Sequence, residues 1–118
     1  MAPLPLQEPT FLILTALAEQ PRYGYDVIQQ VAALSGGRVT LRAGTLYGAL
    51  DRLADQSWIA VDREEAVDGR LRRYYRITDD GAAVLSAELG RLRANADAAA
   101  RGLRARAAAL LTPPPTPA

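Results

Sequence analysis

The 118-residue sequence contains no cysteine and no histidine, and these two absences narrow what the chain can do. Without cysteine there is no disulfide framework and no thiol chemistry. Without histidine, the most common nucleophile–base pairs, most zinc sites and the usual proton switch near neutral pH are missing. The sequence also shows neither a convergent pair of carboxylates nor a phosphate-binding loop. We therefore expect no enzyme, no cofactor and no metal site.

Long apolar runs are missing as well. No stretch approaches the roughly 18 residues of a membrane span. Residues 1–9 have neither the basic start nor the apolar segment of a secretory signal, so the cytoplasm is the expected compartment. Hydrophobic residues nonetheless make up 49% of the chain, which is enough for one domain with a modest core.

Lysine is also absent, so all 14 basic residues are arginine. The net charge of +1 is too small to indicate a nucleic-acid partner by itself. The distribution of charge says more, because four arginines occur within residues 70–76, which contain no acid. The guanidinium group is a planar fork that fits phosphate and guanine. The cluster favours a nucleic-acid partner, although ion pairs with Glu64 or Glu65 on a solvated hairpin would also explain it.

Apolar periodicity predicts three helices, a hairpin and a final long helix. The expected elements are helices over 11–19, 23–34 and 42–56, strands over 58–64 and 70–78, and a helix from 79 to 111. The first helix is apolar on nearly every side and must be buried on more than one face. Asp68-Gly69 is the turn signal between the strands, in a loop that begins at Glu65 and exceeds two residues. This order is that of a winged helix-turn-helix.

The expected third helix has one apolar face and one open face. Leu46, Leu50 and Leu53 follow the i, i+4, i+7 pattern. Gly44 and Gly48 lie on the opposite face, where each glycine costs about 1 kcal/mol relative to alanine. Such a cost indicates that something approaches this face closely.

The last helix carries a heptad seam, which predicts that it pairs two subunits. Thr78 is its expected N-cap, followed by Asp79 and Asp80 at the positive end of the helix. Arg106 interrupts the seam, whose apolar members are Leu85, Leu89, Leu92, Ala96, Ala99, Leu103 and Leu110. The alanine-rich middle is compatible with close helix packing or with space for a ligand between subunits. Residues 112–118 are rich in proline and are expected to form a disordered tail.

Local motifs sharpen this interpretation. They are Leu14-Thr-Ala-Leu17, Tyr23-Gly-Tyr-Asp-Val-Ile28, Gly44-Thr-Leu-Tyr-Gly-Ala-Leu-Asp-Arg-Leu53, Asp68-Gly-Arg70 and Arg73-Tyr-Tyr-Arg-Ile-Thr-Asp-Asp-Gly81. Over about residues 6–95 the sequence resembles the PadR family of bacterial regulators, in its compact branch with a single C-terminal helix. The resemblance implies a two-fold dimer on a pseudo-palindromic operator, usually a repressor that a small-molecule effector releases.

Two positions depart from the family pattern. Ser57 stands where the family usually has glycine, at a place suited to a left-handed helix cap. The last helix has no aromatic residue, whereas some compact members hold flat ligands between tryptophans there. The single tryptophan of this chain is Trp58, on the first hairpin strand.

We therefore predict a mainly α protein with a small β-hairpin. Residues 1–78 are expected to form a winged helix-turn-helix DNA-binding domain, and residues 79–111 a dimerisation helix. The expected DNA contacts are Tyr23, Arg42, Thr45, Tyr47, Gly48, Arg52, Arg70 and Arg72. The expected dimer contacts are Leu85, Leu89, Leu92, Ala96, Ala99 and Leu103.

Several assignments have alternatives. Tyr47 suits both a DNA contact and a place beside the core, while Tyr25 is expected to pack against the first helix. Arg73 shares strand parity with Leu71 and Tyr75, so a structural role is open for it. The near-neutral charge leaves open a winged-helix module that binds proteins and not DNA. An enzyme or metabolite carrier would lack any assignable reacting group.

Overall fold

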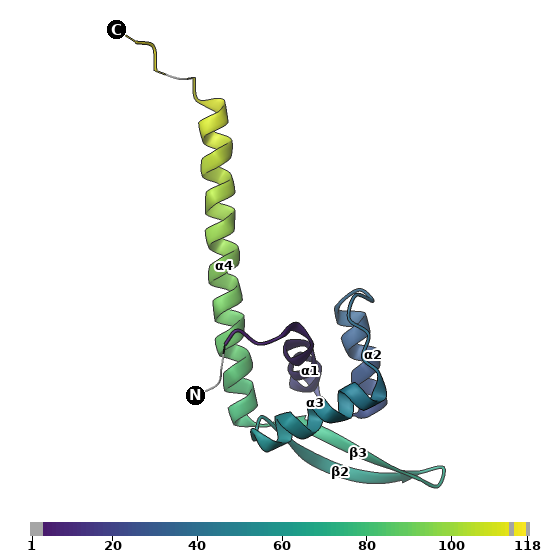
Figure 1. Ribbon diagram of the computed structural model, residues 1–118. Helices are drawn as coiled ribbons and strands as arrows, with labels where there is room; N and C mark the ends of the chain where they lie inside the picture. Colours follow the sequence, from purple (N-terminus) through teal and green to yellow (C-terminus); the bar gives the residue numbers. More distant parts are fainter. Residues whose placement is uncertain (1–3, 114, 118) are drawn as a thin grey trace. The chain divides into compact units, whose positions relative to one another are not determined.

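The computed structural model describes residues 4–113 and 115–117, which form four helices and three strands (Figure 1). The elements are α1 (Glu8–Glu19), β1 (Arg22–Tyr23), α2 (Gly24–Leu34), α3 (Ala43–Asp55), β2 (Ile59–Val67), β3 (Arg70–Ile77) and α4 (Asp79–Leu111). The chain divides into two compact units, one ending at Glu88 and the other beginning at Leu89. The predicted class, a mainly α winged helix-turn-helix with a long C-terminal helix, is confirmed.

The core of the first unit lies among α1, α2, α3 and the sheet. In α1 the all-round apolar pattern is explained, because five of its residues are buried: Leu12, Ile13, Leu14, Ala16 and Leu17. The predicted leucine stripe of α3 is buried together with Ala49. Since burial of each such leucine or isoleucine contributes about 1.5–3 kcal/mol, this core holds α3 rigidly with its other face open.

The sheet has three strands in the antiparallel order β1-β3-β2. The expected long loop from Glu65 is wrong, because β2 continues to Val67, which pairs with Arg70. Asp68 and Gly69 close the hairpin with φ values of 51° and 74°. Positive φ at both central residues is the geometry of a type I′ turn, whose twist matches the strands and keeps the ladder intact to the turn. The two residues of β1 are too few to show a strand period and were not predicted.

A bulge in β2 decides which side chains share a face of the hairpin. The register shifts between Val61 and Arg63. Val61 pairs with Tyr75, and Arg63, two residues further along β2, pairs with Tyr74, which is adjacent to Tyr75 in β3. Beyond the bulge, Glu65 pairs with Arg72. The extra residue therefore places Arg63 and Glu65 on the same face as Tyr74 and Arg72.

Arg22 joins the end of α1 to the start of α2. Its side chain is only 4% exposed, and its Nε donates to the carbonyl of Ala16 at 2.9 Å. The two terminal nitrogens donate to Glu19 at 2.9 Å and to Asp26 at 3.0 Å. The guanidinium thus donates at once to a carbonyl in the last turn of α1, which has no partner within the helix, and to two carboxylates.

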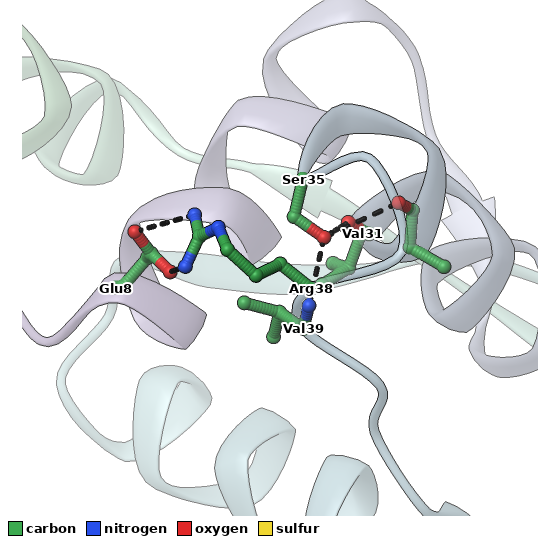
Figure 2. A network of polar contacts seen from close by, with 6 residues as sticks. Glu8, Val31, Ser35, Arg38 and Val39 are labelled. Carbon is green, nitrogen blue, oxygen red and sulfur yellow. Dashed lines mark hydrogen bonds and ion pairs between the residues drawn. The ribbon is translucent and has the colours of Figure 1, made fainter.

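The turn after α2 is closed by side-chain hydrogen bonds (Figure 2). The Ser35 hydroxyl donates to the carbonyl of Val31 at 2.9 Å and accepts the N–H of Val39 at the same distance. Arg38 forms a two-pronged ion pair with Glu8, at 2.6 and 2.9 Å. This pair ties the loop before α3 to the first turn of α1.

The junction from α3 through the sheet to α4 is also fixed by backbone geometry. Ser57 has a φ of 64°, its N–H donates to Ala54, and the next N–H donates to Leu53 at 3.0 Å. This is a Schellman cap, so Ser57 occupies the left-handed position that was expected to suit glycine. Thr78 is the N-cap of α4, as predicted: its hydroxyl accepts the N–H of Gly81 at 3.0 Å and donates to the carbonyl of Ser57.

The helix α4 ends at Leu111, and the described residues after it carry no helix or strand. The expected tail includes Pro114 and Ala118, which lie outside the described residues, as do residues 1–3 of the expected signal-free start. Within residues 4–113 and 115–117, no helix is both long and apolar enough to span a membrane. The same residues contain no cluster of acids suited to a metal ion.

Candidate nucleic-acid interface

The open face of α3 is the first component of the site. Thr45, Tyr47 and Arg52 are exposed, and Gly48 is half-buried. A Cβ at Gly44 would meet nothing within 4 Å, and one at Gly48 would meet only the Nη1 of Arg52 at 3.6 Å. Packing inside the described chain therefore does not require these glycines, and their cost to the helix has no internal explanation.

Charge differs along this face. Arg42 is the exposed N-cap residue, whereas Asp51 and Asp55 are exposed toward the C-terminal end. Two carboxylates would repel a phosphate backbone, so the first two turns of α3 are the part suited to lie against DNA. Recognition helices commonly use their N-terminal residues in this way.

The second component is a groove between α3, the start of α2 and β3. We call it the hairpin groove and define it by Tyr23, Tyr47, Leu71 and Arg72, which line two adjoining hollows of about 350 and 600 Å³. The smaller hollow adds Gly24, Asp51, Arg73 and Tyr75, and the larger adds Tyr25, Val67, Asp68 and Arg70. A strand of a duplex that passes between a recognition helix and a wing would meet this surface.

Tyr47 closes the groove against the first turn of α2. A Cβ at Gly24 would lie 2.7 Å from the hydroxyl oxygen of Tyr47, so the phenol occupies the space that a larger residue would need. Tyr47 is still 50% exposed. A DNA contact and a place beside the core are therefore compatible, because the ring packs on Gly24 while much of its surface remains open.

The expectation for Tyr25 is wrong. Instead of packing against α1, Tyr25 is 59% exposed and lines the hairpin groove. It lies two residues before Val27, whose side chain is fully buried, and therefore on the opposite side of α2. The helical spacing from Val27 was a usable signal that the residue faces outward.

The hairpin arginines fall into two groups. Arg63 forms ion pairs with Asp62 at 3.0 Å and Glu65 at 2.8 Å, and Arg73 pairs with Glu64 at 3.2 Å. Among the described residues, none forms an ion pair with Arg70 or Arg72. The alternative of a solvated, ion-paired hairpin therefore holds for Arg73 and not for the two predicted DNA contacts.

The pKa shifts of Glu65 and Arg73 agree with this division of the hairpin arginines. The hydrogen bond from Arg63 lowers the pKa of the Glu65 carboxyl, with smaller contributions from Tyr74 and Arg72. Contact with Tyr75 and then Glu64 raises the pKa of Arg73. The acids of β2 are thus held by Arg63 and Arg73, which leaves the charge of Arg70 and Arg72 available to an outside anion.

Four of these side chains form a stack across the base of the hairpin. The guanidinium of Arg63 lies 3.9 Å from the ring centre of Tyr74. The Tyr74 and Tyr23 rings meet edge to face at 5.4 Å, and the guanidinium of Arg72 lies 4.5 Å from the ring centre of Tyr23. Arg72 is half-buried, so its position is more restricted than that of a free surface arginine.

Arg52 lies away from the hairpin groove. It lines a third hollow of about 320 Å³, together with Trp58 and residues of the N-terminal segment such as Leu6. The neighbouring acids Asp51 and Asp55 form no ion pair with it in the described part of the chain. The predicted DNA contacts therefore gather on two sides of α3 and not at one point.

The predicted dimer contacts are not equivalent. Leu85 is half-buried and packs against the core of the first unit. The other five are exposed: Leu89 and Leu92 at 39%, Leu103 at 67%, and both Ala96 and Ala99. From Leu89 onward no described residue of α4 is buried.

Sequence reasoning missed Glu88, which is 1% exposed and accepts the N–H of Leu6. Gly81, Leu85 and Glu88 have i, i+4, i+7 spacing, which places the carboxylate on the core face of α4. That spacing was the available signal.

Comparison with known proteins agrees with this architecture. The sequence model of the PadR-like family of transcriptional regulators matches residues 13–87. An uncharacterised protein of Lysinibacillus sphaericus is 35% identical over 75 residues, which are 64% of this chain and 69% of the relative.

Solved structures give the same result. A PadR family regulator from Clostridium difficile has a TM-score of 0.69 and 25% identity, covering 82% of this chain and 99% of the other. A PadR family regulator from Eggerthella lenta has a TM-score of 0.64 and 30% identity, covering 80% of each chain. Bacillus subtilis PadR, solved with operator DNA, has a TM-score of 0.63 and 23% identity over 70% of this chain and 47% of its own. Since the family model covers more than half of the sequence, the chain belongs to the PadR-like family, whose members are transcription regulators and not enzymes, as the sequence predicted.

Proposed function

We propose that this protein is a homodimeric, sequence-specific DNA-binding repressor that a small molecule releases from its operator. The observation that carries the proposal is a glycine-cleared face on α3 beside the guanidinium groups of Arg70 and Arg72, which form no ion pair among the described residues. A relative of the same fold, Bacillus subtilis PadR, has been solved with operator DNA, which supports this use of the fold. Work on chromosomal operators would take place in the cytoplasm, the compartment that the sequence predicts.

The two elements would divide the recognition of DNA. The first two turns of α3 would lie in the major groove, where Thr45 would contact bases while Arg42 and Tyr47 reach the backbone. Arg52, in the last turn, would contact a base at the edge of this surface. Gly48 would let the duplex approach. The hairpin arginines would contribute charge that is largely independent of sequence.

Dimerisation through α4 is supported by the exposed apolar stripe of this helix. From Leu89 on, no described residue of this helix is buried, so its apolar stripe stays in contact with water unless a second copy covers it. Leu89, Leu92 and Leu103 would be covered by the same residues of a second copy. Replacing Leu89 and Leu92 with glutamate should yield monomers in sedimentation, whereas Leu111→Glu, outside the seam, should leave the dimer intact. A dimeric double variant would refute the assignment of the seam.

Release by an effector is supported by the family to which the chain belongs. The small residues Ala96 and Ala99 would leave room between two paired helices, as an effector site there would need. A ligand that binds the DNA-free dimer more tightly than the bound one would shift the protein off its operator.

The deciding experiment is titration of the protein with the DNA upstream of its own gene and with random DNA. With six to ten phosphate contacts, affinity should fall by roughly 10³- to 10⁵-fold between 50 and 200 mM salt. Arg52→Ala should weaken operator binding by about 1–3 kcal/mol and random binding much less, if it contacts a guanine. Arg70→Ala should weaken binding to the operator and to random DNA by the same factor. It should also lower the slope of log affinity against log salt concentration by about one for each phosphate that the variant no longer binds.

One alternative remains testable in the same assay. The near-neutral net charge of +1 leaves open a winged-helix module that binds proteins and not DNA. Absence of DNA binding, or an affinity that does not change with salt, would favour that alternative and refute ours.

A further inference from the structure

We propose that Tyr23 is a positioning residue whose ring holds the Arg72 guanidinium in the hairpin groove, where it binds one backbone phosphate of the DNA strand passing between α3 and the hairpin. This inference rests on the proposed DNA binding and deepens it. It also gives Tyr23 a role different from the direct DNA contact that the sequence predicts.

The first support is the placement of the Arg72 charge. Its guanidinium lies 4.5 Å from the ring centre of Tyr23. Both residues line both hollows of the hairpin groove, and so does Tyr47 of α3. A cation in this groove would face the DNA strand that passes between the recognition helix and the hairpin. Backbone phosphate is the anion that a DNA strand presents there.

The second support is the fate of the nearest acid. Glu65 is the cross-strand partner of Arg72 and the obvious candidate to neutralise it. Instead, Glu65 accepts a hydrogen bond from Arg63 at 2.8 Å. Arg63 is itself fixed over the Tyr74 ring at 3.9 Å. The carboxylate is therefore held mainly by another arginine, and Arg72, which lies over the Tyr23 ring, forms no hydrogen bond or ion pair among the described residues.

The third support is energetic. A long surface arginine loses much side-chain entropy when a ligand orders it. Tyr23 is half-buried, is anchored by register to Tyr74 and contacts its ring edge to face at 5.4 Å. A guanidinium stacked on so fixed a ring is partly ordered before DNA arrives, so less entropy is lost on binding.

The test combines protein variants with a chemically altered operator. Footprinting on the upstream DNA first locates the backbone segment beside the hairpin. Each phosphate of that segment is then replaced, one at a time, by an uncharged methylphosphonate. For the wild type, one replacement should weaken binding as Arg72→Ala does, and in Arg72→Ala that replacement should have no further effect.

Tyr23 is tested in the same series. Tyr23→Phe keeps the ring and should bind within twofold of the wild type. Tyr23→Leu removes the platform and should lose about two- to fivefold in affinity. In the Arg72→Ala background, Tyr23→Leu should cost nothing more. Arg76→Ala, which removes a charge of the same strand outside the groove, should leave the methylphosphonate effect unchanged.

A direct measurement guards against misfolding of the leucine variant. In the DNA-free protein, the NMR signals of the Arg72 Cδ and Nε protons should show a ring-current shift in the wild type and in Tyr23→Phe. That shift should vanish in Tyr23→Leu. Equal losses in Tyr23→Phe and Tyr23→Leu, additive losses with Arg72→Ala, or no ring-current shift would overturn the inference. Wild-type protein without any DNA binding would instead refute the proposed function.

Discussion

Gly81 in the first turn of α4 lies directly against the carbonyl group of Trp58 at the start of the hairpin. A Cβ at position 81 would overlap the carbonyl oxygen and would lie only 2.8 Å from the carbonyl carbon. The same carbonyl accepts the N–H of Thr78 at 3.0 Å. The close approach therefore fixes the hairpin against the first turn of α4.

Gly81→Ala should destabilise the protein by at least about 2 kcal/mol, since the clash is with backbone that cannot move aside cheaply. Denaturant unfolding at fixed protein concentration measures the change. Gly90→Ala in the same helix is the matched control, because a Cβ there meets nothing within 4 Å. That variant should gain up to about 1 kcal/mol from helix propensity. Equal effects of the two variants would contradict the packing described.

Ser57→Gly should stabilise the protein by about 0.5–1 kcal/mol, because a φ of 64° costs serine more than glycine. The Schellman hydrogen bonds are made by backbone groups and survive the change. Ser86→Gly, at an exposed site inside α4, is the control and should lose about 0.5 kcal/mol. Denaturant unfolding should show that the free energy of unfolding rises in Ser57→Gly and falls in Ser86→Gly. A fall in Ser57→Gly would count against the left-handed cap.

Much of this architecture is encoded locally and was therefore predictable. The leucine spacing of α3, the Asp68-Gly69 turn and the Thr78 cap each depend on a few neighbouring residues. The open face of α3 also follows from spacing, because burial of the leucine stripe places Gly44 and Gly48 opposite it.

The remainder depends on partners distant in sequence. The bulge before Arg63 shifts the register and so decides that Arg63 and Glu65 share a face with Tyr74 and Arg72. No local pattern marks a two-residue strand such as β1, yet its register sets Tyr23 against Tyr74. Which arginines form ion pairs among the described residues, and which form none, is thus a tertiary property that the run of arginines alone does not predict.

Arg22→Met should destabilise the fold by about 2–3 kcal/mol. The change keeps the aliphatic stem but removes the donor to Ala16 and to two carboxylates, and hydrogen bonds to charged groups contribute about 1.5–3 kcal/mol. Asp26 is 29% exposed and Glu19 is 74% exposed, so water replaces part of the loss. Thermal and denaturant unfolding give the value.

Arg38→Gln is the control for Arg22, since it breaks an exposed ion pair with Glu8 and should change stability little. The hydrogen bond from Arg38 lowers the pKa of Glu8, so that pKa should return toward its usual value in the variant. NMR titration of Glu8 shows whether the pair was broken. Comparable losses in Arg22→Met and Arg38→Gln would deny Arg22 its role as an internal anchor.

Gly24→Ala should impair DNA binding while leaving the fold intact. A Cβ at this position meets the Tyr47 hydroxyl at 2.7 Å and the ring at 3.0 Å, so the phenol must swing out of the hairpin groove. The displaced atoms are the far end of a flexible side chain, and the stability change should stay within about 0.5 kcal/mol. Affinity for the operator should fall several-fold, because Tyr47 would no longer line the hairpin groove in which the DNA strand is proposed to lie. Calorimetry and operator titration measure the two effects.

Two further variants establish whether the displacement of Tyr47 causes that fall in affinity. In a Tyr47→Ala background, Gly24→Ala should have no additional effect on affinity, because the side chain that it displaces is gone. Gly44→Ala should weaken operator binding by a different route, since nothing in the described chain lies within 4 Å of its Cβ and only DNA would meet the added methyl group. Its effect should therefore persist in the Tyr47→Ala background. Were Gly24→Ala to cost as much affinity without Tyr47 as with it, the backbone of α2 itself would be the DNA contact and Tyr47 a bystander.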